Sequence, residues 1–87
     1  MRVVMVVKDN TEVTREAMEW MEDFKKETGY DVDWEDPETI SGEIFATHHD
    51  ILQYPTLCVT DSSSKILASW SGKLPQFEEV TYIMRDA

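Results

Sequence analysis

Residues 45–57, FATHHDILQYPTL, decide the fold of this chain more than any other stretch of its sequence. The first part completes a helical pattern that ends near His49, and residues 56–60 form a run that predicts a strand. The Tyr-Pro-Thr triplet at residues 54–56 therefore stands where the chain enters that strand. A Pro-Thr pair is common by itself, but its position between a helix and a strand is informative.

On the N-terminal side of this stretch, the sequence predicts a strand, a helix and a second strand. Arg2–Val7 is a nearly continuous apolar run, which is typical of a strand buried on both faces of a sheet. Residues 11–28 have helical spacing, and Gly29 stands where a glycine commonly ends a helix. Residues 30–35 alternate apolar and acidic side chains, which predicts a strand suited to a sheet edge. The apolar stripe of the helix is Val13, Ala17, Trp20, Met21 and Phe24.

The helix that ends near His49 has a weaker pattern than the first one. Asp36 and Pro37 predict its start, as the N-cap and the first helical residue. Gly42 lies inside it and weakens the prediction. The residues that fall roughly on one side of this helix are Ile40, Ile44, Thr47 and His48.

The C-terminal part predicts a hairpin followed by a last helix. Residues 56–60 and 65–71 form its two strands around the polar turn at 61–64, and Leu74-Pro75 opens the helix. The complete order is β-α-β-α-β-β-α. This order predicts an α/β fold in one domain over residues 1–87, with a four-stranded mixed sheet and helices on both faces.

The composition narrows the classes of partner. Eight basic and 18 acidic residues give a net charge of −10, which disfavours nucleic acid and anionic membrane surfaces as partners. The acidity indicates either solubility or a face for a basic partner. The single cysteine excludes an internal disulfide and a multi-cysteine metal site. We find neither a secretory-signal pattern nor an apolar stretch long enough for a membrane span, so we expect a cytoplasmic location.

The stretch quoted above resembles a segment of the thioredoxin superfamily, which includes glutaredoxin-like proteins. In that family a helix ends, an isoleucine or valine follows, and Tyr/Thr-Pro-Thr enters the third strand; residues 70–72, Trp-Ser-Gly, add to the resemblance. The resemblance implies that Pro55 is cis and lies beside the position of the redox cysteines. Here residues 11–14, Thr-Glu-Val-Thr, stand in place of Cys-x-x-Cys, and Ala17 matches a small residue of the pattern. Because a threonine hydroxyl cannot exchange with a disulfide, we expect a redox-inactive domain.

The candidate binding residues form three groups. Thr11 and Thr14, helped by Lys8, either hydrogen-bond a ligand at a helix N-terminus or only cap that helix. Tyr54 and Pro55 are implicated by the resemblance, because family members pair extended peptides with the backbone before the proline. The alternative is that this proline only shapes the fold. Trp70 lies either on a binding face or partly buried against the last helix.

These residues predict a module that binds a protein or an extended peptide, as a monomer or weak homodimer, without a cofactor. One alternative is a monothiol or glutathione-linked oxidoreductase that uses Cys58, although a central strand predicts an inert, buried thiol. Another is a structural homo-oligomerisation domain that uses the hairpin edge and Trp70. We expect no metal site, because the adjacent His48 and His49 diverge on a helix and the acidic run at residues 31–36 lacks the glycine of a calcium loop.

Overall fold

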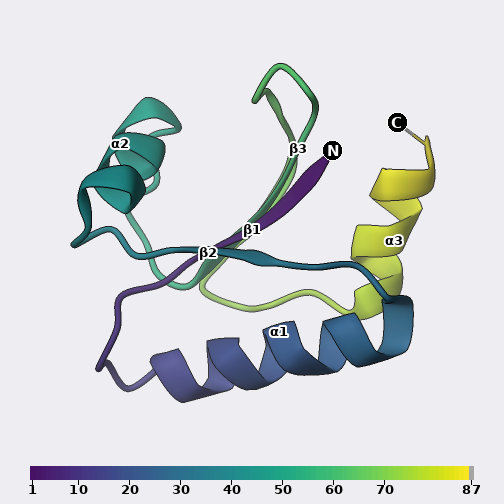
Figure 1. The fold of residues 1–87 in the computed structure, drawn as a ribbon, viewed down its shortest axis with the longest axis horizontal. Coiled ribbons are helices and arrows are strands. Elements are labelled where there is room, and N and C mark those ends of the chain that lie inside the picture. The colour runs from purple at the N-terminus through teal and green to yellow at the C-terminus, as the bar shows by residue number, and fades with distance from the viewer. Residues whose placement is uncertain (87) are drawn as a thin grey trace.

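The computed structural model describes residues 1–86 and contains the predicted elements in the predicted order (Figure 1). The sheet has the strand order β2-β1-β3-β4, in which β1 is parallel to β2 and antiparallel to β3, and β3 is antiparallel to β4. The predicted four-stranded mixed sheet is therefore confirmed. The elements are β1 (Arg2–Val6), α1 (Thr14–Thr28), β2 (Asp33–Glu35), α2 (Ile40–His48), β3 (Thr56–Thr60), β4 (Ile66–Ser71) and α3 (Phe77–Asp86).

Helices cover both faces of the sheet, as predicted. Helices α1 and α3 pack on one face, and α2 lies on the other (Figure 1). Successive side chains of β1 point to opposite faces, so Val3 and Met5 join the first core while Val4 and Val6 join the second. Both cores need apolar residues, which explains why β1 is an unbroken apolar run.

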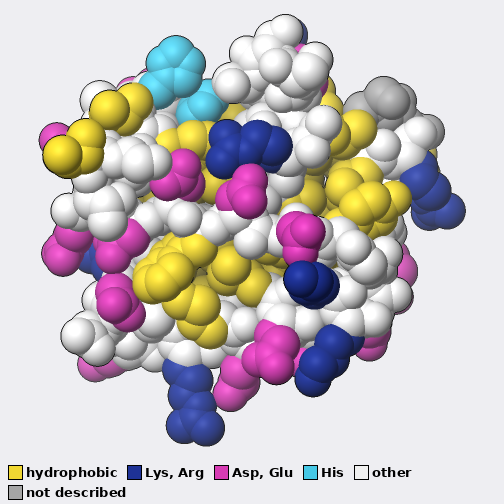
Figure 2. All heavy atoms as spheres, viewed as in Figure 1, with side chains coloured by type: hydrophobic (Ala, Val, Ile, Leu, Met, Phe, Trp, Pro, Cys, Tyr) yellow, Lys and Arg dark blue, Asp and Glu magenta, His cyan; other side chains and the backbone are white. Residues whose placement is uncertain are grey.

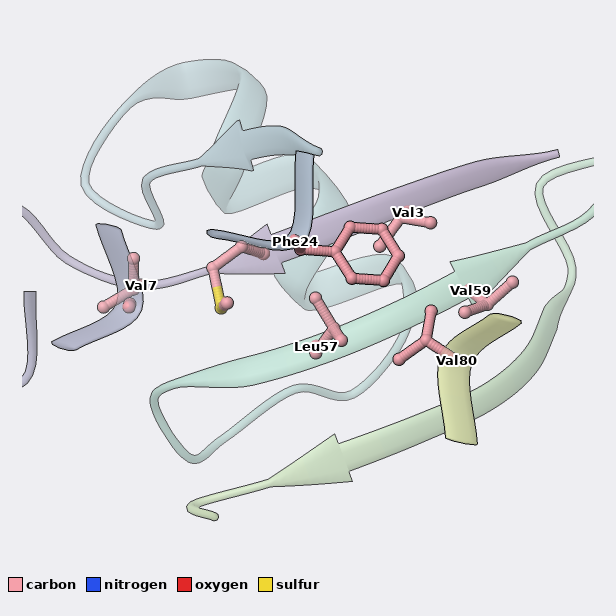
Figure 3. Packing of buried hydrophobic residues seen from close by; sticks show 8 residues of the cluster. Val3, Val7, Phe24, Leu57, Val59 and Val80 are labelled. Carbon is pink, nitrogen blue, oxygen red and sulfur yellow. The ribbon is translucent and has the colours of Figure 1, made fainter. Parts of the chain in front are cut away.

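Phe24 is central to the core on the α1 face. Figure 3 shows its ring among Val3, Leu57 and Val59 of the sheet and Val80 of α3. The ring is fully buried, and its centroid lies 4.9 Å from that of the stacked Trp20 ring and 5.5 Å from that of the edge-on Phe77 ring. This aromatic cluster ties α3 to α1 and to the sheet.

The start of α2 differs from the prediction. The helix begins at Ile40, and the Thr39 hydroxyl caps it by accepting a hydrogen bond of 3.1 Å from the Gly42 N–H. Asp36 instead organises the preceding turn, where its carboxylate accepts a hydrogen bond of 2.9 Å from the Glu38 N–H. Pro37 is therefore in this turn and not in the helix.

The orientation of α2 follows from its small residues. Gly42 and Ala46 face inward and are buried, whereas Ile40 and Ile44 are 81% and 64% exposed. A Cβ atom built on Gly42 would overlap the carbonyl oxygen of Asp36, so this glycine allows the helix to lie against the turn. Gly42, which weakens the sequence pattern, is a close-contact point of the fold.

Several other elements are shorter than predicted. Helix α3 starts at Phe77 and not at Leu74-Pro75, and strands β1 and β4 are each one residue shorter than predicted. Helix α1 starts at Thr14 and not at residue 11, because residues 9–13 form turns after β1. Strand β2 covers only the three residues that pair with β1, so the alternating pattern before Asp33 is not strand. Trp34 in β2 is 40% exposed, and its indole N–H donates a hydrogen bond of 2.8 Å to the Val7 carbonyl.

Candidate functional site

The loop between β1 and α1 is held together by its own threonines. The Thr14 hydroxyl donates to the Lys8 carbonyl at 2.6 Å and accepts from the Thr11 N–H at 2.9 Å. The two hydroxyl oxygens are 2.9 Å apart, and Thr11 is the donor because the Thr14 proton points to Lys8. The N-cap of α1 is Val13, which makes no side-chain capping bond. The threonines therefore do not cap the helix, and their hydroxyl protons are used inside the loop.

Lys8 connects this loop to the residues before β3. Its ammonium nitrogen lies 5.6 Å from the centroid of the Tyr54 ring and 4.0 Å from a carboxylate oxygen of Glu38. A cation over an aromatic face is attracted by the ring quadrupole. The contact between the loop after β1 and Tyr54 is therefore made by the Lys8 side chain.

The Tyr54-Pro55 peptide bond is cis, which confirms that expectation. Pro55 is buried, and its carbonyl accepts a hydrogen bond of 2.8 Å from the Gly72 N–H. The Gln53 carbonyl accepts one of 2.6 Å from the Thr56 hydroxyl. Within residues 1–86, no hydrogen bond uses the backbone N–H or C=O of Tyr54. The described fold therefore leaves both backbone groups of this residue without an internal partner.

A hollow of about 240 Å³ lies beside Tyr54 on the α2 side of the molecule. Leu52 borders it with a side chain that is 92% exposed, and Glu43 and Asp50 place carboxylates along it. The sequence interpretation missed these three residues. The available signal was Leu52, the second of two adjacent apolar residues in the linker between α2 and β3. The remaining lining residues are Pro37, Ala46, Thr47 and Ile51.

Trp70 does not belong to this group of residues. It is paired with Leu57 in the register of β3 and β4, and it packs against the core on the α1 face. Tyr54 packs against the core on the opposite face. Trp70 lines a separate hollow of about 630 Å³ together with Leu74 and Pro75, which precede α3. Its side chain is half-buried.

Cys58 is fully buried in β3, where it packs with Val4, Val6 and Ala46. Burial raises the pKa of its thiol to about 11, because a thiolate is poorly solvated among apolar side chains. At pH 7 only about one thiol in ten thousand is then ionised. The thiolate is the reactive species, so the site gives this cysteine no nucleophilic role.

We therefore expect Cys58 to resist alkylation in the folded protein at neutral pH. The rate of labelling by iodoacetamide, followed by mass spectrometry, should rise by at least about a hundredfold when the protein is unfolded in guanidinium chloride. A free cysteine peptide under both conditions controls for the effect of the denaturant on the reagent. Rapid labelling of the native protein would contradict the inert thiol and favour the monothiol alternative.

Across residues 1–86, no three His, Cys, Asp or Glu side chains converge as ligands of a metal ion. None of the helices in this part of the chain has the length and apolar character that crossing a membrane requires.

Comparison with known proteins establishes the fold. The sequence matches no family model and no curated protein. A solved structure of thioredoxin 1 from the thermophilic bacterium Thermosipho africanus superposes with a TM-score of 0.70 at 14% sequence identity, covering 99% of this chain and 92% of that one. At this identity the similarity concerns the fold alone, and the present chain has the thioredoxin-like fold with a single cysteine.

Proposed function

We propose that this thioredoxin-like domain binds an extended segment of another protein beside Tyr54 and Pro55, and that it does so without redox chemistry. The observation that carries the proposal is the backbone of Tyr54, whose N–H and C=O have no partner within the described residues. An extended peptide forms two hydrogen bonds with such a residue, in the manner of an added strand.

The surroundings of Tyr54 support a peptide as the ligand. The Tyr54 ring is half-buried and carries the Lys8 ammonium over its face, which offers a peptide one aromatic and one charged contact. The neighbouring hollow of about 240 Å³ can accept one side chain, with the apolar Leu52 at its border. A small molecule would need more enclosed polar groups than this open site provides.

The two alternatives have less support. A glutathione-linked reaction needs an accessible thiolate, and Cys58 is buried with a raised pKa. A homo-oligomer would bring together two copies that each carry a net charge of −10, which opposes association. The partner is therefore proposed to be a different protein, and a cytoplasmic location stays a prediction.

Amide hydrogen exchange provides a direct test with the unmodified protein. We expect the Tyr54 N–H to exchange rapidly in the free domain, because it has no internal hydrogen bond. An array of short extended peptides rich in Val and Thr should yield a binder that slows this exchange and shifts the NMR signals of Lys8 and Gln53. A binder that leaves the exchange of Tyr54 unchanged would contradict the proposal.

A matched pair of variants tests the side-chain contact. Tyr54→Ala should lower the affinity for the same peptide by about tenfold, which corresponds to about 1.4 kcal/mol of binding free energy. The control is Tyr82→Ala on α3, where an equally large ring is 60% exposed and distant from the site. Equal affinities of the two variants would show that the Tyr54 ring takes no part in binding.

A further inference from the structure

The outer face of α2 carries exposed apolar side chains that no other part of residues 1–86 covers. Ile40 and Ile44 are four residues apart on the helix, so their side chains lie on one side, and His48 continues the same line. Single exposed apolar residues are common on protein surfaces, but adjacent ones on a helix face more often mark a binding surface. We call Ile40, Ile44 and His48 the α2 stripe.

The α2 stripe lies between two hollows of the surface. One hollow, of about 670 Å³, is lined by the stripe together with Phe45 and His49. The other, of about 530 Å³, is lined by the stripe together with Thr47. Figure 2 shows hydrophobic side chains next to the two histidines at the upper left, over α2. The surface is therefore a ridge flanked by two grooves, which is a shape that a second helix can pack against.

Among the described residues, neither Ile40 nor Ile44 belongs to a hydrophobic core or packs against one. The buried side of α2 consists of Gly42 and Ala46, and the close approach of Gly42 to Asp36 fixes which side faces inward. With that orientation fixed, polar residues at positions 40 and 44 would satisfy the fold equally well. Exposed isoleucines instead leave apolar surface in water, which a partner can cover.

The charge around the α2 stripe indicates what kind of partner fits. Glu43 lines the second hollow and is exposed, and of the residues that the structure describes, no Lys or Arg lines either hollow. Glu35 lines the first hollow, but its side chain is only 16% exposed, lies 3.9 Å from the Arg2 guanidinium and accepts a hydrogen bond of 2.8 Å from the Ser41 hydroxyl. Burial, and then the neighbouring His48, lowers the pKa of His49, so its ring adds no positive charge at neutral pH. A second copy of this chain would place acidic residues against acidic residues, whereas a basic segment gains attraction.

We propose that the α2 stripe is the docking surface for a basic amphipathic helix of a partner protein. From Ile40 to His48 the stripe extends about 12 Å along the helix axis, which two turns of a partner helix can cover. Apolar residues at i, i+3, i+4 and i+7 of that helix would contact the isoleucines, and its Lys or Arg residues would lie near the exposed Glu43. This surface is separate from the backbone groups of Tyr54, and the proposal does not depend on the peptide site.

The test uses synthetic helical peptides as probes and the full chain as the target. A Leu/Lys peptide with leucines at i, i+3, i+4 and i+7 should shift the NMR signals of the α2 stripe, with an affinity that falls as salt is added. A Leu/Glu peptide with the same leucines, and a Ser/Lys peptide with the same charges, should each bind at least about tenfold more weakly. If the Leu/Lys peptide shifts NMR signals of the protein outside the α2 stripe and not those of the stripe, the proposal is overturned.

Variants locate the binding surface. The double substitution Ile40→Ser and Ile44→Ser should lower the affinity for the Leu/Lys peptide by about tenfold or more. It should leave the fold intact, because both side chains are exposed. Tyr82→Ser is the control at an exposed apolar position on α3, and Tyr54→Ala should leave this peptide unaffected. Unchanged affinity in the double isoleucine variant would refute the site. So would a dimer in sedimentation equilibrium that dissociates in that variant, since the occupant would then be a second copy.

Discussion

Gly42→Ala is expected to lower the free energy of unfolding by about 2 kcal/mol, although alanine is the better helix former. Helix propensity alone favours alanine by about 1 kcal/mol. A Cβ atom at this position, however, overlaps the backbone carbonyl of Asp36, which is not a flexible side-chain end that can move aside. Forcing α2 away from the turn is a form of overpacking and costs about 3 kcal/mol. The melting temperature should therefore fall by roughly 10 °C.

Whether Gly42→Ala lowers or raises the free energy of unfolding shows which is larger, the cost of the overlap with Asp36 or the gain in helix propensity. Thermal unfolding followed by circular dichroism would measure it, with Thr47→Ala as the control at an exposed position of α2. That control removes a β-branched residue without a close contact and should be neutral or slightly stabilising. A Gly42→Ala protein that melts higher than the parent would show that the helix does not lie against Asp36.

Phe24→Ala should have the largest effect of any single substitution proposed for this protein. The ring is fully buried and is stacked on Trp20, so its removal leaves a cavity at the centre of the core. Such substitutions cost about 3–5 kcal/mol, which is a large share of the roughly 5–15 kcal/mol that stabilises a domain. A urea titration followed by tryptophan fluorescence measures the loss, because Trp20 reports on the same cluster.

A conservative variant keeps this prediction testable if the alanine variant does not fold. Phe24→Leu retains most of the apolar volume and should cost less than half as much as Phe24→Ala, although it loses the stacking on Trp20. Tyr82→Ala, on the exposed side of α3, should change stability by no more than about 0.5 kcal/mol. Similar stabilities for Phe24→Ala and Tyr82→Ala would contradict the packing described for the core.

The features that the sequence predicted correctly are those that depend on local pattern. The unbroken apolar run of β1 predicted burial on both faces, and the structure assigns Val3 and Val4 to opposite cores. The α1 stripe likewise places Phe24 in the core. The orientation of α2 was beyond this reasoning, because it depends on the contact of Gly42 with the Asp36 backbone, which no periodicity reports.

The candidate site was predictable in part. The resemblance implied that residues 11–14 lie beside Pro55, and the contact that the structure shows between these two regions is that of the Lys8 ammonium with the Tyr54 ring. The hydrogen bonds of the threonines were not predictable, because capping and loop cross-linking use the same residue types. Trp70 was a candidate because an aromatic residue on the second hairpin strand could lie on a binding face, whereas the alternation of side chains in β4 places it on the face opposite Tyr54.

The bonding of Thr11 and Thr14 also limits how easily a dithiol centre could be engineered into this domain. The Thr11 hydroxyl donates to the Thr14 hydroxyl, which donates to the Lys8 carbonyl, and this chain of hydrogen bonds closes the turn. A C–S bond is longer than a C–O bond, and a thiol is a weak hydrogen-bond donor and acceptor. Cysteines at both positions would therefore lose the hydrogen bonds that close the turn. A redox-active variant would therefore need other interactions that stabilise the turn, so that the two sulfur atoms stay close enough to form a disulfide.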